Sequence, residues 1–153
     1  MEIEKKYLTK KVPFSLEGFK KAEISQCYIS TEPVIRLRNH SGKYMLTVKG
    51  DGLISREELE LNITKEQYER LIKKSETSIV IKTRYYIPLK CGLTAELDVY
   101  HSQLDGLITT EVEFSSLEEM ETFAPPRWFG IDISDNKMYK NSYLEIHGRP
   151  AYK

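Results

Sequence analysis

Pairs of like charges recur along the chain, each pair separated by one apolar or small residue. Side chains two apart on a β-strand lie on the same face, so each pair would share one side of its strand. The acidic and basic pairs are Glu2/Glu4, Arg36/Arg38, Glu58/Glu60, Lys82/Arg84, Glu96/Asp98 and Glu111/Glu113. Clustered carboxylates opposite Arg and Lys suit a divalent cation together with a polyanion, because hard cations bind carboxylate oxygens and phosphates bind guanidinium and ammonium groups.

An ordinary antiparallel sheet with one solvated face and one face packed on helices is the alternative interpretation. Any single Glu-x-Glu pair fits that alternative. Like charges on one face repel, however, and a face that needs only solubility would mix the signs. The four acidic and two basic pairs together therefore favour a binding site for metal and phosphate.

Eight alternating segments must position these charges. Period-two alternation predicts strands over residues 2–8, 22–30, 33–39, 43–49, 56–63, 79–87, 94–100 and 108–114. Turn signals at 39–42 and 50–52 favour hairpins, because Gly and Asn tolerate the positive φ of tight turns. Eight antiparallel strands could close into a barrel, which would remove exposed edges and enclose the charged faces.

Helices are predicted outside this barrel. Capping boxes at Thr64/Gln67 and Ser116/Glu119 mark two helix starts, the first for a helix over about 64–75. Weaker helical patterns cover 136–146 and 14–20. The expected fold is α+β and mainly β, a closed eight-stranded antiparallel barrel with a charged interior, in a single domain spanning 1–153.

The composition excludes several classes of function. The 153 residues contain 23 Lys+Arg and 23 Asp+Glu, so the net charge of zero lacks the basic excess of a duplex-DNA binder. No stretch of about 18 apolar residues and no signal-peptide pattern occurs, so we expect a cytoplasmic protein that binds neither nucleic acid nor membrane. Cys27 and Cys91 are expected to be buried, reduced thiols.

The amino terminus Glu2-Ile3-Glu4-Lys5-Lys6 is an ExExK signature, and further segments fit one family in order. These segments are 26–28, 35–38, 46–50, 56–60, 81–85, 96–100, 111–113 and 139–144. The chain thus resembles CYTH-domain proteins of the triphosphate tunnel metalloenzyme superfamily, and most closely the small bacterial inorganic triphosphatases. One departure is Asp132-Ile133-Ser134, where the bacterial pattern usually has Glu-Val-Thr.

The resemblance implies an eight-stranded tunnel and a role for each matching residue. Residues matching the ligands of Mg²⁺ or Mn²⁺ are Glu2, Glu4, Glu111 and Glu113, with Asp98 and Glu96 as additional contributors. Those matching the phosphate-binding residues are Lys6, Arg36, Arg38, Lys49, Lys82 and Arg84. An acidic side that holds a second metal or orients water would include Glu58, Glu60 and Glu96. Tyr28 would pair with Lys82 near the terminal phosphate.

The implied activity is metal-dependent hydrolysis of inorganic triphosphate to pyrophosphate and phosphate. The partner would be a triphosphate-containing small molecule, and a homodimer is possible. The alternatives are an adenylyl cyclase, a nucleoside or thiamine triphosphatase, and a non-catalytic polyphosphate-binding module. Recognition of an organic group would need aromatic or apolar residues at a tunnel mouth, which the sequence does not locate. A pure anion binder gains nothing from carboxylates beside its ligand.

Overall fold

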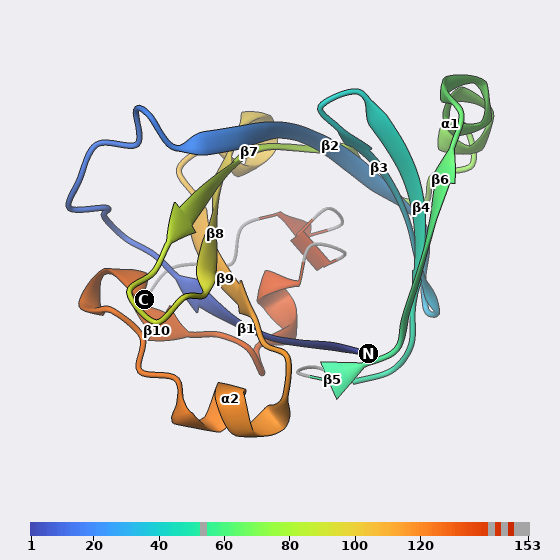
Figure 1. The fold of residues 1–153 in the computed structure, drawn as a ribbon. Helices are drawn as coiled ribbons and strands as arrows, with labels where there is room; N and C mark the ends of the chain where they lie inside the picture. Colours follow the sequence, from blue (N-terminus) through green and yellow to red (C-terminus); the bar gives the residue numbers. More distant parts are fainter. Residues whose placement is uncertain (53–54, 141–142, 145–146, 149–153) are drawn as a thin grey trace.

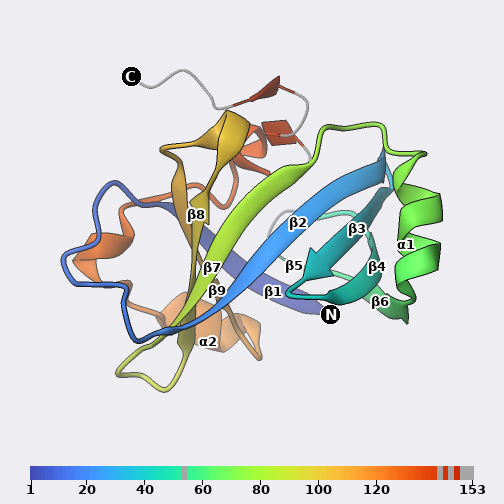
Figure 2. The same cartoon turned by 90° about the horizontal axis from the view of Figure 1, so that it is seen from above.

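The computed structural model describes residues 1–52, 55–140, 143–144 and 147–148. Ten strands form one antiparallel sheet in the order β10-β1-β9-β8-β7-β2-β3-β4-β6, and β5 pairs with β1. The strands are β1 (Glu2–Leu8), β2 (Lys20–Thr31), β3 (Val34–His40), β4 (Lys43–Lys49), β5 (Ser55–Arg56), β6 (Glu58–Ile63), β7 (Val80–Pro88), β8 (Thr94–Tyr100), β9 (Ile108–Glu113) and β10 (Ile131–Asp132). Figure 1 looks along the axis of the resulting ring of strands, and Figure 2 shows β7, β2 and β3 running side by side along its wall.

The ring is a nearly closed barrel, which confirms the predicted fold. Its seam lies between β6 and β1, where the two-residue strand β5 pairs with β1 through Glu2↔Arg56 and Ile3↔Ser55. The predicted strands 2–8, 43–49 and 94–100 match the observed bounds. The predicted strand 56–63 was wrong in being continuous, because Glu57 separates β5 from β6 and lets the chain turn across the seam.

Both predicted capped helices form outside the barrel. In α1 (Lys65–Ile72), the Thr64 side chain accepts from Gln67 N, and the Gln67 side chain accepts from Thr64 N. In α2 (Leu117–Thr122), Ser116 accepts from Glu119 N, but the Glu119 side chain binds Ser115 N instead of closing the reciprocal box. Three short 3₁₀ helices are η1 (Ser102–Leu104), η2 (Arg127–Phe129) and η3 (Lys137–Tyr139).

Three expectations about local structure need correction. Residues 14–20 form bends and a turn instead of a helix, because Gly18 adopts a φ of 89° there. The helix predicted over 136–146 is limited to η3 and helical residues at 143–144, and part of that range lies outside the described residues. Cys27 is buried as expected, but Cys91 is exposed, because it lies in the turn between β7 and β8.

The hairpin turn predicted at 39–42 joins β3 to β4. Ser41 and Gly42 have φ values of 48° and 91°, the positive values that a tight two-residue hairpin requires. Asn39 accepts a bond from Gly42 N at 2.9 Å and fixes this geometry. The turn sets the register Arg36↔Thr47 and Arg38↔Met45, and thereby places both arginines on the inner face.

Two apolar clusters lie on the outer face of the barrel, and a third fills one end of it. One cluster, which includes Leu37 and Tyr68, joins α1 to the outer face of the sheet. A second, which includes Tyr7, Leu97 and Phe129, covers the outer face of β1 and β8. A third, which includes Tyr139, packs where the carboxyl-terminal segment crosses one end of the barrel (Figures 1 and 2). The rest of the barrel interior is lined mainly by polar side chains. No described helix is long and apolar enough to span a membrane.

Candidate active site

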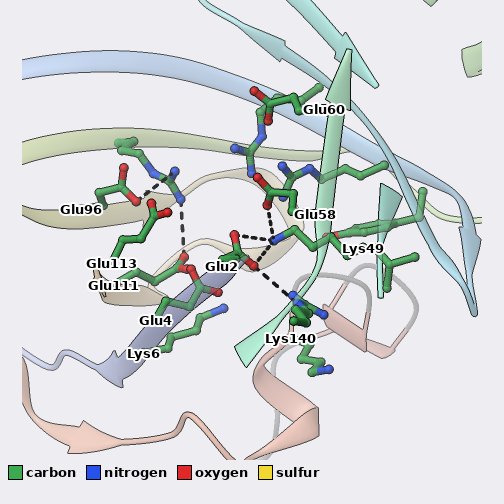
Figure 3. Close-up of a pocket in the computed structure, with 16 residues that line it drawn as sticks. Glu2, Glu4, Lys6, Lys49, Glu58, Glu60, Glu96, Glu111, Glu113 and Lys140 are labelled. Atoms are coloured by element: carbon green, nitrogen blue, oxygen red, sulfur yellow. Dashed lines mark hydrogen bonds and ion pairs between the residues drawn. The ribbon is translucent and has the colours of Figure 1, made fainter. Parts of the chain in front are cut away.

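A highly charged pocket of about 290 Å³ lies inside the barrel (Figure 3). The side chains come from strands on all sides of the wall and from the segment after η3. They are Glu2, Glu4, Lys6, Tyr28, Val34, Arg36, Arg38, Lys49, Arg56, Glu58, Glu60, Arg84, Glu96, Glu111, Glu113 and Lys140. The strand alternation read from the sequence thus brings both signs of charge into one space.

The acidic side of the pocket is built by β1 and β9. Their register pairs Glu4 with Glu113 and Lys6 with Glu111. Burial and the neighbouring carboxylates of Glu111 and Glu2 raise the pKa of Glu4 to about 8. Burial also opposes ionisation of Glu111, but the charges of Lys6 and Arg84 outweigh it and lower the pKa of Glu111 to about 2. The carboxyl groups are therefore crowded closely enough that ionised Glu111 opposes ionisation of Glu4.

The basic side includes two buried arginines on β3. Arg38 donates from Nε and NH2 to Gln26 Oε1 at 2.9 and 2.6 Å, and Arg36 NH2 lies 3.4 Å from Thr47 Oγ1. Neither guanidinium forms an ion pair with any described carboxylate. Burial, with the charges of Arg36 and Arg84, lowers the pKa of Arg38 to about 9. Uncompensated buried cations are costly, and an anionic ligand would relieve that cost.

Other cations in the pocket have acidic partners. Lys49 Nζ lies 2.9 Å from Glu2 Oε1 and 3.4 Å from Glu58 Oε2, and Arg56 Nε lies 3.4 Å from Glu2 Oε1. The dashed lines of Figure 3 follow these contacts between β1, β4 and β6. The bonds tie together the strands on either side of the seam, so this part of the site also stabilises the barrel.

Lys82 and Asp98 share the inner face of the sheet with Arg84 and Glu96, but they do not line the pocket and are buried deeper in the barrel. Both side chains are fully buried, and Lys82 Nζ lies 2.7 Å from Asp98 Oδ2. Asp98 also accepts two bonds from Arg84, at 2.7 Å from Nε and 2.9 Å from NH2. Although burial alone would raise it, Arg84 and Lys82 hold the pKa of Asp98 well below its usual range. Asp98 thus orients Arg84, whose NH2 reaches 3.4 Å from Glu111 Oε1 inside the pocket.

Comparisons with known proteins agree with this geometry. The chain is 38% identical to an inorganic triphosphatase of Nitrosomonas europaea over 149 residues, covering 95% of this chain and 97% of that protein. The chain belongs to the inorganic triphosphatase family. An inorganic triphosphatase of Acetivibrio thermocellus is 31% identical over 146 residues, covering 94% and 92% of the two chains. No protein-family model matches the chain.

Solved structures support the same family fold. The crystal structure of the inorganic triphosphatase NE1496 superimposes with a TM-score of 0.70 at 34% identity, and covers 95% of each chain. HpAC1 from Hippeastrum has a TM-score of 0.61 at 17% identity, covers 79% of this chain and 83% of its own, and shows a common fold alone. The chain therefore shares its barrel fold with a solved inorganic triphosphatase.

Most predicted site residues of this inorganic triphosphatase meet in the pocket, but Lys82 and Asp98 do not line it. Lys82 forms an ion pair with Asp98, and the expected pairing of Tyr28 with Lys82 stays a prediction. Tyr28 faces the pocket and pairs across the strands with Arg36. The cross-strand neighbour of Lys82 is Ile24, which is four residues from Tyr28 along β2. Strand alternation assigns a face but not a depth, so it could not separate the buried pair from the lining residues.

Two cations that line the pocket received no role from the sequence. Arg56 shares the alternation of Glu58 and Glu60, so the same two-residue spacing could have identified it. Lys140 follows η3 and reaches the pocket only because the carboxyl-terminal segment crosses the end of the barrel. No local pattern around Lys140 could have predicted this position.

The donor chemistry of the acidic side fits a hard divalent cation. Glu2, Glu4, Glu111 and Glu113 offer carboxylate oxygens, the ligands that Mg²⁺ and Mn²⁺ prefer. In the described part of the chain, no three His, Cys, Asp or Glu side chains already converge on one metal position. The crowding that raises the pKa of Glu4 is nevertheless what a cation among these carboxylates would relieve.

Proposed function

We propose that the protein hydrolyses inorganic triphosphate to pyrophosphate and phosphate inside the barrel. The observation that carries this proposal is the pair of buried guanidinium groups, Arg36 and Arg38, that no described carboxylate neutralises. A compact chain of phosphates has the charge density and the acceptor oxygens that such groups bind. The names of the family members at 38% and 31% identity support the same substrate.

Arginine and lysine side chains bind the substrate and spread its negative charge. Arg36, Arg38 and Arg84 line the pocket together, with Lys6 on β1. A triphosphate at neutral pH repels an incoming nucleophile, so neutralisation of its oxygens lowers the barrier to attack. The two bonds that Arg84 donates to Asp98 fix the plane of its guanidinium group, so this cation is oriented before the substrate arrives.

Carboxylates would hold Mg²⁺ or Mn²⁺ next to the phosphates. We assign Glu2, Glu4, Glu111 and Glu113 to this role, because they line the acidic side. When bound, the cation supplies Lewis-acid stabilisation of charge on the phosphate oxygens. Glu96 faces Glu111 across β8 and β9, and would complete this side.

Glu58 and Glu60 are the candidates for orienting the attacking water. They project into the pocket from β6, and Glu60 Oε2 lies 3.4 Å from Thr47 Oγ1. In the reaction, the water oxygen bonds to the terminal phosphorus while the bond from that phosphorus to the bridging oxygen breaks. Pyrophosphate leaves with the bonding electron pair, and the water proton is passed to a carboxylate or to solvent.

Phosphate release from tripolyphosphate in Mg²⁺, Mn²⁺ or EDTA tests this proposal. We expect release with either metal and loss of release in EDTA. The variant Glu4→Gln keeps the size of the side chain but removes one carboxylate, and should lower kcat by about 100-fold or more. Its unfolding midpoint without metal should not fall, because Glu4 is buried beside Glu111 and Glu2.

Glu118→Gln, on the exposed surface of α2, is the matched control and should keep full activity. Wild-type rates in Glu4→Gln under limiting metal would exclude the metal assignment. Binding of tripolyphosphate without release would identify a non-catalytic polyphosphate-binding module instead. Release of pyrophosphate without phosphate from ATP would identify a cyclase.

A further inference from the structure

Two arginines of the pocket are held by similar hydrogen bonds, but their acceptors differ in charge. Arg84 donates from Nε and NH2 to the Asp98 carboxylate, at 2.7 and 2.9 Å. Arg38 also donates from Nε and NH2, at 2.9 and 2.6 Å, but its acceptor is the amide oxygen of Gln26. A carboxylate would neutralise the guanidinium group as well as orient it, whereas an amide only orients it. Gln26 thus holds a buried cation in place without cancelling its charge.

Gln26 lies next to Arg38 on the inner face of the sheet, because the two residues pair across β2 and β3. The side chain of Gln26 is fully buried and does not line the pocket, so it acts on a ligand through the arginine. A guanidinium group only donates, so the amide turns its oxygen toward Arg38 and its Nε2 atom away. This Nε2 atom has no hydrogen-bond partner among the described residues. A buried donor without a partner lowers stability, so stability alone does not explain a glutamine at this position.

The charge of Arg38 is also less compensated than that of Arg84. Arg84 lies within ion-pair distance of three carboxylates, and Arg38 of none that the structure describes. Burial, with the charges of Arg36 and Arg84, lowers the pKa of Arg38 to about 9. A polyanion that enters the pocket would supply the negative charge that the protein itself does not place beside Arg38.

We propose that Gln26 is a positioning residue that sets the affinity for the phosphate chain. Its neutral oxygen fixes the guanidinium group of Arg38, while the positive charge of that group stays available to the substrate. The inference rests on the proposed function, which assigns Arg38 to the phosphates. A carboxylate at position 26 would keep an acceptor for the same bonds, but it would cancel much of the attraction between Arg38 and phosphate.

The variant Gln26→Glu separates orientation from charge, because it keeps the size and the acceptor of the side chain. The Kd of tripolyphosphate, measured by calorimetry in EDTA, should rise about tenfold or more. In Mg²⁺, KM should rise with it, whereas kcat should change much less. The unfolding midpoint of the free protein should not fall, because the new carboxylate pairs with a buried cation. If Gln26 served only the fold, a variant that keeps the bonds to Arg38 would keep the wild-type Kd.

Gln103→Glu is the matched control for this measurement. Gln103 is exposed in η1 and does not line the pocket, so the same substitution adds the same charge where water and salt screen it. The Kd of tripolyphosphate in this variant should stay within about twofold of the wild-type value.

A double-mutant cycle with Gln26→Leu and Arg38→Met tests whether Gln26 acts through the arginine. Gln26→Leu removes the acceptor, so it should raise the Kd about threefold to tenfold while Arg38 is present. In the Arg38→Met background it should have little further effect. A wild-type Kd in Gln26→Glu, or an equal loss from Gln26→Leu in both backgrounds, would overturn the inference. Failure of the wild type to bind or hydrolyse tripolyphosphate would instead overturn the proposed function.

Discussion

Two groups of buried charges in the barrel wall have opposite surroundings. Arg36 and Arg38 face the pocket with neutral partners, Thr47 and Gln26. Lys82 lies deeper inside the barrel, where its ammonium group is 2.7 Å from a carboxylate oxygen of Asp98. All of these side chains are nearly inaccessible to water. Burial alone therefore does not identify a ligand-binding charge, whereas a buried charge without a counter-charge does.

Arg84 connects the two groups. On one side it donates two bonds to Asp98, and on the other its NH1 and NH2 lie 3.4 Å from oxygens of Glu96 and Glu111. The Lys82–Asp98 ion pair thus has a structural role. Its contact with Arg84 fixes where that guanidinium group lies in the pocket. This division predicts different effects on stability and on activity for the two groups.

Asp98→Asn should produce the largest loss of stability. The change leaves the Lys82 ammonium group buried without its anion and weakens both bonds to Arg84. Removal of one member of a buried ion pair costs about 3–5 kcal/mol in the free energy of unfolding. Urea unfolding measures this quantity.

The double variant Asp98→Asn/Lys82→Met is the matched control for that experiment. It removes the uncompensated ammonium group along with the carboxylate, so it should recover part of the lost stability. Activity should remain low in both variants, because Arg84 has lost its orientation. A stable Asp98→Asn protein would show that this carboxylate does not support the wall.

Arg36→Met should have the opposite effect on stability, with a smaller magnitude. Among the described residues, this side chain donates one long hydrogen bond, at 3.4 Å, and its Nε atom has no hydrogen-bond partner. Its replacement by a similar apolar chain should raise the free energy of unfolding by up to about 1 kcal/mol. Affinity for tripolyphosphate should fall about tenfold or more, as calorimetry can measure.

Tripolyphosphate itself provides the control for the arginine variant. Bound at 100 times its dissociation constant, it should stabilise the wild type by about 2.7 kcal/mol, and the variant by much less at the same concentration. If Arg36→Met destabilised the free protein and left binding unchanged, Arg36 would belong with the structural residues. The proposed contrast between the two groups would then be wrong.

The sequence predicted the barrel well because strand alternation and turn residues are local signals. Alternation fixes which face each residue takes, and the turn at Ser41 and Gly42 fixes the register of β3 and β4. The sequence could not predict how deeply Lys82 is buried, because its burial depends on the side chains that fill one end of the barrel. There, Lys82 Nζ lies 5.4 Å from the ring centroid of Tyr100, a residue of the cluster that includes Tyr139.

A pocket lined by residues near both ends of the chain shows more clearly that sequence patterns do not predict contacts between distant segments. Tyr143 and His147 lie in a segment without strand alternation, and they meet Pro33 and Val34 only through the folded chain. Contacts between segments that are more than 100 residues apart leave no periodic signal. The proposed metal site likewise stays a prediction, because the sequence supplies the carboxylates but does not show whether they converge on one position.

The smallest effect is expected for an ion pair on the outer surface. Lys5 Nζ lies 3.7 Å from Asp132 Oδ2, with side-chain exposures of 26% and 44%. Lys5→Ala should change the free energy of unfolding by at most about 0.5 kcal/mol, because water and salt screen exposed charges. Urea unfolding at low and high salt measures the change, and a loss above about 1 kcal/mol would contradict the prediction. Since this pair has the same charged groups as Lys82–Asp98, the difference between the two losses reports what burial adds to an ion pair, together with the two bonds from Arg84 that Asp98→Asn also weakens.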